Sequence, residues 1–185
     1  MTSLLLALFQ LAACIGFGLL GLKTLGLASA VRASERLPLA FALGFGFLGW
    51  IVFPVAMAGG ATQLPLALLL AAGLAGLVFL PWRGFTFPAR PQGVFHLTLL
   101  VLLGFVLLLY LMQALVPPAD GDSMAYHFAR VKMTAQNGRL TFLPQAVEGA
   151  GPMLVQMTYL PAFVLGGERS MTLWTCLSGL MASLL

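Results

Sequence analysis

The sequence contains very little charge. Asp, Glu, Lys and Arg make up only 8% of its 185 residues, against roughly a quarter in soluble globular proteins, and 61% of the residues are apolar. This composition excludes a soluble globular domain. The nine Lys and Arg residues outnumber the five Asp and Glu residues, but they lie in short segments between long apolar runs. Such a distribution reflects membrane topology, and we expect no nucleic-acid partner.

Cysteine is equally scarce. Cys14 and Cys176 are the two cysteines of the chain, and each lies in the middle of an apolar run. The sequence therefore predicts no disulfide framework, no CxxC redox pair and no zinc site.

The sequence contains several long apolar runs. Four of them have about 18 or more residues, the length that crosses a hydrocarbon core, and they predict four transmembrane helices within residues 1–116. Two weaker runs within residues 151–185 predict two further membrane helices. The first carries Pro161 and the second stops inside an apolar stretch at Leu185, so we expect an N-terminal fragment with a truncated last helix. The six runs are 3–22, 38–58, 64–81, 94–116, 152–165 and 171–185.

The positions of Lys and Arg predict an orientation for this polytopic, all-α membrane protein. Residues 23–37 carry three of them and residues 82–93 carry two, whereas residues 59–63 carry none. Short cytoplasmic loops are enriched in Lys and Arg. We therefore expect residues 23–37 and 82–93 in the cytoplasm, the N-terminus and residues 117–150 outside, and the protein in the cytoplasmic (inner) membrane.

The polar segment 117–150 contains a helical pattern. Apolar residues recur at positions i, i+4, i+7 and i+11, and polar residues follow the same spacing on another face, which predicts a short amphipathic helix over about 123–137. Asp122 or Ser123 is its expected N-cap, and Asn137 and Gly138 its end. We expect its apolar face on the membrane or the core and its polar face toward a cavity between the helices. The apolar positions are Met124, Phe128, Val131 and Ala135, and the polar ones are Ser123, His127, Arg130 and Thr134.

Two carboxylates, Asp120 and Asp122, follow the fourth apolar run. Carboxylates are costly to hold beside hydrocarbon, so they indicate a functional role. At a helix N-terminus Asp122 would stay ionised and could act as a base toward a hydroxyl or amine. Capping of the helix explains the same residue equally well. Together with His127, the two carboxylates could also bind a divalent cation.

Three cations lie in the segment 117–150, which we expect outside, although Lys and Arg are generally enriched in cytoplasmic loops. Arg130, Lys132 and Arg139 could bind the phosphate of a lipid-linked substrate. Snorkelling toward lipid headgroups accounts for any one of them equally well.

A resemblance to a known family begins at residues 122–128, which read DSMAYHF. It is followed by Asn137-Gly138, by Gly151-Pro152 and by Gly166-Gly167-Glu168. This order resembles the first outward loop of bacterial membrane glycosyltransferases of the C superfamily, which are similar to protein O-mannosyltransferases and to the aminoarabinose transferases of lipid A. Members often read Asp-x-x-x-Tyr-His there. The resemblance covers about residues 115–185.

The resemblance implies an inverting transfer of a sugar from a polyprenyl-phosphate donor to a lipid, glycan or protein acceptor on the outer face of the membrane. It implies Asp122 as the base and Asp120 as a helper, with no obligatory cofactor. The chain departs from the family at Gln156, near which members often carry an acidic residue. The resemblance places five residues on the substrate, namely Tyr126, His127, Arg130, Lys132 and Arg139.

Two other classes of function stay open at this point. A transporter or flippase could use Asp120, Asp122 and His127 as a proton or ion site. Such sites usually lie in broken helices near the middle of the membrane, whereas the apolar runs carry no acidic residue between their ends. A non-catalytic subunit of a membrane assembly is the other alternative.

Overall fold

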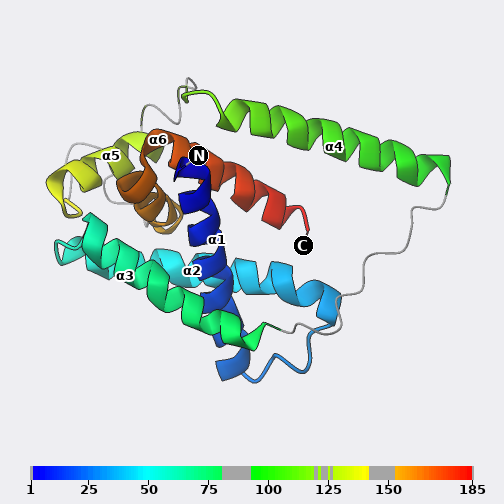
Figure 1. Cartoon of the computed structure of the whole chain (residues 1–185), viewed down its shortest axis with the longest axis horizontal. Coiled ribbons are helices and arrows are strands. Elements are labelled where there is room, and N and C mark those ends of the chain that lie inside the picture. The colour runs from blue at the N-terminus through cyan, green and yellow to red at the C-terminus, as the bar shows by residue number, and fades with distance from the viewer. Residues whose placement is uncertain are drawn as a thin grey trace.

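The computed structural model describes residues 2–80, 93–118, 121, 125, 127–141 and 153–184. This part of the chain is helical and has no strand, so the predicted all-α class is confirmed (Figure 1). The helices are α1 (Thr2–Thr24), α2 (Ala33–Met57), α3 (Gln63–Leu74) with a 3-10 helix (Ala75–Phe79), α4 (Val94–Ala114), α5 (Phe128–Asn137) and α6 (Leu154–Ala182).

Helices α1, α2 and α4 are long and apolar enough to cross a membrane. They correspond to the first, second and fourth predicted spans, although α2 begins at Ala33 and not at residue 38. The third predicted span is shorter than expected, because α3 tightens into the 3-10 helix and the helical stretch Gln63–Phe79 stays below 18 residues. Leu80, which precedes Pro81, is extended, as expected for a residue before proline.

Glycine lets the first helices approach closely. A Cβ atom on Gly18 would collide with the Ala40 carbonyl of α2, and one on Gly44 would collide with the Cys14 carbonyl of α1. Small residues of this kind allow backbone-to-backbone contact between membrane helices. The backbones of α1 and α2 are thereby in direct contact.

The two weak C-terminal runs form a helical hairpin within α6. Gly167 interrupts the helix with φ 72° and ψ −168°, a conformation that only glycine adopts without strain. Trp174 Nε1 donates a hydrogen bond of 3.2 Å to Thr158 Oγ1, 16 positions earlier. In a straight helix these residues would be about 24 Å apart, so the two halves must lie antiparallel. Gly167 therefore lies at the turn of the hairpin.

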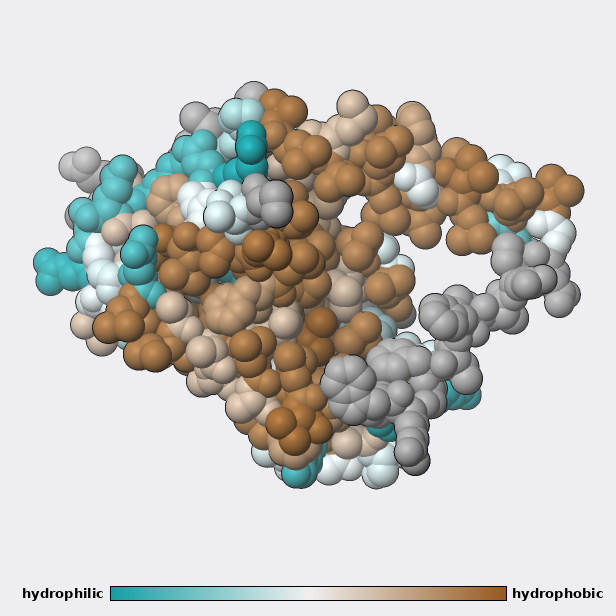
Figure 2. Space-filling model, viewed as in Figure 1, coloured by the Kyte–Doolittle hydropathy of each residue, from teal (hydrophilic) through white to brown (hydrophobic). Residues whose placement is uncertain are grey.

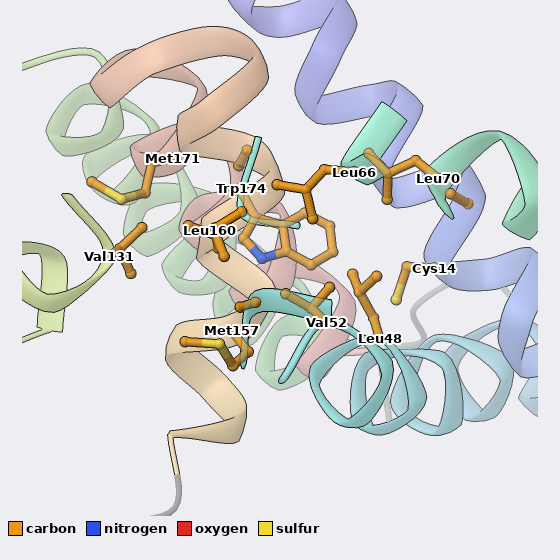
Figure 3. Packing of buried hydrophobic residues seen from close by; sticks show 14 of the residues in the cluster. Cys14, Leu48, Val52, Leu66, Leu70, Val131, Met157, Leu160, Met171 and Trp174 are labelled. Carbon is orange, nitrogen blue, oxygen red and sulfur yellow. The ribbon is translucent and has the colours of Figure 1, made fainter. Parts of the chain in front are cut away.

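Trp174 lies at the centre of the core (Figure 3). Its indole is fully buried and packs against two aromatic rings of α2, with centroid distances of 6.1 Å to Phe41 and 6.0 Å to Phe45. Val131 of α5 and Val52 of α2 belong to the same cluster as this indole (Figure 3). One apolar core therefore joins α1, α2, α3, α5 and the α6 hairpin.

The loops that connect the helices lie at two ends of the described fold. At one end, the Lys23 ammonium lies 3.7 Å from the centroid of the Phe79 ring, so the end of α1 meets the end of the 3-10 helix. At the other end, Ala61 N donates to Gly138 O at 3.0 Å, which joins the α2–α3 connection to the end of α5. The hairpin turn lies at this second end too, because Thr172 Oγ1 donates to the last turn of α4 at Ala114 O.

Helix α4 stands apart from the other long helices and packs mainly on α6 (Figure 1). Nearly all of its large apolar side chains are exposed, and Figure 2 shows the apolar surface that they form. An apolar surface of this extent would be costly in water. Helix α4 is therefore suited to a lipid environment.

Candidate functional site

Helix α5 is held against the hairpin by its apolar face. Phe128 and Val131 are buried, and the Phe128 ring meets the Tyr159 ring edge-on at 5.6 Å. The helix ends at Gly138, which has a left-handed φ of 65°. The predicted stop is confirmed, and so is the predicted apolar face at Phe128 and Val131, which lies on the core of the protein. Met124 of that face lies outside the described residues, and Arg130 and Thr134, which were predicted on the polar face, are buried too.

Three of the predicted site residues lie outside the described residues, namely Asp120, Asp122 and Tyr126. The same holds for the predicted N-cap at Asp122 or Ser123. The helix predicted over 123–137 is therefore confirmed from Phe128 to Asn137. Within the ranges that the structure describes, no group of three His, Cys, Asp or Glu side chains could hold a metal ion.

His127 contacts the residue at which the chain departs from the glycosyltransferase family. Gln156 Nε2 lies 3.0 Å from His127 Nδ1. The amide nitrogen can only donate, and Nδ1 can accept this hydrogen bond in the ring tautomer that carries its proton on Nε2. Gln156 is thus a neutral partner of the His127 ring, whereas an acidic residue at this position would bring a negative charge to the ring.

Arg130 was expected on the polar face of the helix, yet it is only 7% exposed. Its Nη2 donates to Met153 Sδ at 3.7 Å, and a thioether is a weak acceptor. Its Nε is buried and has no acceptor in the described part of the chain. A buried guanidinium with so few acceptors favours the binding of an anion.

The other two predicted cations lie in different surroundings. Lys132 Nζ forms an ion pair of 2.5 Å with Glu168 Oε1, next to the hairpin turn. Arg139 follows Gly138 and is exposed. The three cations therefore do not share one environment, and of these three Arg130 is the one that combines burial with a shortage of acceptors.

A cavity of about 290 Å³ opens beside the start of α5, between the end of α4 and the second half of the hairpin. Phe128, the neighbour of His127, forms part of its wall. Sequence reasoning missed its polar lining, because threonine and glutamine within apolar helices give no distinctive signal. The lining residues are Tyr110, Gln113, Ala114, Pro118, Phe128, Thr172, Thr175 and Cys176.

Comparison with known proteins adds nothing to this geometry. No protein-family model, no curated protein and no solved structure matches the chain. The resemblance to C-superfamily glycosyltransferases therefore rests on the sequence motifs alone.

Proposed function

We propose that this protein is a membrane glycosyltransferase that moves a sugar from a polyprenyl-phosphate donor to an acceptor on the outer face of the inner membrane. The observation that carries the proposal is Arg130, a buried guanidinium whose Nε has no acceptor in the described part of the chain. It lies on the helix that follows the Asp-x-x-x-Tyr-His motif. A phosphate group would satisfy this guanidinium.

The proposed step is a single displacement. The acceptor hydroxyl or amine attacks the anomeric carbon while the bond from that carbon to the phosphate oxygen breaks. Asp122 takes the acceptor proton, and polyprenyl phosphate leaves with the bonding electron pair. Arg130 stabilises the negative charge that develops on the leaving phosphate, which is worth most in a site shielded from water.

The orientation in the proposal follows from charge. The basic segment 23–37 lies at the Lys23 end of the described fold, and α5 lies at the opposite end. With the positive-inside preference, this arrangement supports an outward position for α5. The proposed transfer would then take place on the outer face of the membrane.

The proposal can be tested in membranes that contain the protein, supplied with a panel of polyprenyl-phosphate sugars. Release of polyprenyl phosphate is the readout, because it is common to every acceptor. We expect Arg130→Gln to slow release about 100-fold, since loss of one preorganised charge partner costs roughly 10²–10³ in rate. Arg32→Gln is the matched control, because the Arg32 side chain is 84% exposed and lies in the segment 23–37, at the other end of the fold, and it should change release less than twofold.

Two results would refute the proposal. One is release by Arg130→Gln at the rate of the unaltered protein. The other is movement of the intact donor across the membrane without release of polyprenyl phosphate, which would indicate a flippase.

A further inference from the structure

A cavity of about 270 Å³ lies at the Lys23 end of the fold. The end of α1, the connection from α1 to α2, the start of α2 and the 3-10 helix all contribute to its wall. The wall contains two cations and no acidic residue, and the rest of it is apolar. The lining residues are Leu19, Leu22, Lys23, Ala28, Arg36 and Phe79.

The connection from α1 to α2 is folded by its own backbone hydrogen bonds. Gly26 has a left-handed φ of 70°. Gly26 N donates to Lys23 O at 3.0 Å, and Leu27 N donates to Leu22 O at 2.9 Å. This pair of bonds is the Schellman motif, which ends a helix and turns the chain away from it. The turn holds Ala28 where Arg36 of α2 can bind its carbonyl.

The guanidinium of Arg36 is tied to this connection on one side only. Its Nη2 donates to Ala28 O at 2.8 Å and to Val31 O at 3.4 Å. Its Nε is buried and has no acceptor among the residues that the structure describes. Leaving a buried donor unsatisfied is costly, and neutral carbonyl groups do not cancel the charge. An anion in the cavity would supply both the acceptor and the opposite charge.

The second cation of the wall is Lys23, in the last turn of α1. Its Nζ lies 3.7 Å from the centroid of the Phe79 ring, so the ammonium is held over the 3-10 helix. Neither Lys23 nor Arg36 forms an ion pair within the described ranges. Glu35, the neighbour of Arg36, pairs with Arg32 instead. Both positive charges therefore remain available to a ligand.

We infer that this cavity binds the phosphodiester headgroup of an anionic phospholipid of the membrane, between Lys23 and Arg36. A guanidinium donates charge-assisted hydrogen bonds to phosphate oxygens, and an ammonium adds a point charge. A lipid is favoured over a free anion by position. Lys23 lies in the last turn of α1 and Arg36 near the start of α2, and both helices are long enough to cross a membrane, so the two cations lie at headgroup depth.

The inference does not depend on the proposed sugar transfer. The ligand is a phospholipid of the surrounding membrane and not a sugar donor. Its site lies at the opposite end of the described fold from α5, which carries Arg130. Loss of this lipid site would leave the glycosyltransferase proposal untouched, and failure of sugar release would leave the lipid site untouched.

Native mass spectrometry of the purified protein in detergent, titrated with phosphatidylglycerol, measures the dissociation constant of the first bound lipid. We expect phosphatidylglycerol to bind about tenfold more tightly than phosphatidylcholine, whose choline cation the two basic side chains repel. Lys23→Gln should raise the constant about tenfold, as expected for loss of one charge-assisted contact. Arg36→Lys should do the same, because it keeps the charge and removes the Nε–H donor.

Arg32→Gln is the matched control. It removes a charge from the same connection, but the Arg32 side chain is 84% exposed and is paired with Glu35, so the constant should change less than twofold. Melting temperatures without phosphatidylglycerol report whether each variant is folded. If Arg36→Lys is destabilised, the comparison of Lys23→Gln with Arg32→Gln decides alone, because Lys23→Gln leaves both Arg36 hydrogen bonds in place.

Three results would overturn the inference. Equal losses for Lys23→Gln and Arg32→Gln would mean general attraction to a basic surface. Equal affinity for the two lipids would mean that the headgroup charge is not recognised. Displacement of phosphatidylglycerol by inorganic phosphate, supplied in large excess, would assign the site to a free anion. Continued binding of the lipid in that excess would support the phospholipid site.

Discussion

The indole N–H of Trp174 donates a hydrogen bond to the hydroxyl of Thr158 across the α6 hairpin. Thr158 Oγ1 donates in turn to Val155 O at 2.7 Å, and the Thr158 carbonyl accepts from Gln10 Nε2 of α1 at 2.6 Å. The Thr158 hydroxyl therefore connects to the second half of the hairpin, and the Thr158 carbonyl connects to α1. This residue joins the two halves of the hairpin to α1.

Thr158→Val should therefore destabilise the protein. Valine keeps the volume of threonine but leaves the buried Trp174 N–H without an acceptor, which costs about 1–3 kcal/mol. Thermal unfolding in detergent, followed by fluorescence, measures the effect. Ser183→Ala is the control, because the Ser183 hydroxyl forms a similar bond to Leu180 O in an exposed position. Equal melting temperatures for Thr158→Val and the unaltered protein would contradict the prediction.

Gly167→Ala should weaken the hairpin. The φ of 72° and ψ of −168° are strained for any residue with a Cβ atom, and the strain costs about 1–3 kcal/mol. The same unfolding assay serves as the measurement. Gly46→Ala is the matched control, because Gly46 is helical and an added Cβ meets no atom within 4 Å, so it should be neutral or slightly stabilising. Destabilisation by both substitutions alike would show that the turn plays no special part.

The Lys132–Glu168 ion pair should contribute little to stability. The two side chains are 25% and 48% exposed, and solvent screens pairs of this kind to below about 1 kcal/mol. A double-mutant cycle with Lys132→Met and Glu168→Gln measures the coupling free energy. We expect the coupling to fall further in 0.5 M salt. A coupling above about 2 kcal/mol would mean that the pair is shielded from solvent.

Asp122→Asn tests the predicted base. Asparagine caps a helix about as well as aspartate, so stability should change little, while sugar transfer should fall by about 10²–10⁴-fold, the usual worth of a positioned base. Asp120→Asn should cost less. If Asp122→Asn shows normal sugar transfer at a normal protein level, then Asp122 only caps the helix and is not the base. Loss of transfer in chelator, with recovery in a divalent cation, would redirect the mechanism to a metal.

The proposed orientation can be tested by labelling single cysteines in intact cells, with Cys14 and Cys176 replaced by serine. Gln136 lies at the exposed end of α5, so we expect a membrane-impermeant thiol reagent to label Gln136→Cys. Ala89 lies in the basic segment 82–93, and Ala89→Cys should react only after the membrane is permeabilised. Labelling of Ala89→Cys in intact cells would reverse the topology and place α5 in the cytoplasm.

Local sequence determined the features that depend on length, apolar content and turn chemistry. Hydrocarbon thickness sets the length of a span, so α1, α2 and α4 could be read from their apolar runs. The spacing of Phe128 and Val131 gave the buried face of α5, and Gly138 gave its end, because a left-handed residue after a helix is usually glycine. These features follow from residues within one or two helical turns of each other.

Tertiary structure alone decided which polar groups meet. Nothing local to Arg130 indicates that it is buried beside Met153, and the contact of His127 with Gln156 joins residues 29 positions apart. The cavity between α4 and the hairpin likewise depends on the change of direction of α6 at Gly167. Such pairings carry no periodic signal, since they depend on how complete helices pack. The sequence therefore determined the three long apolar helices and the end of α5, and packing decided which side chains are buried or paired.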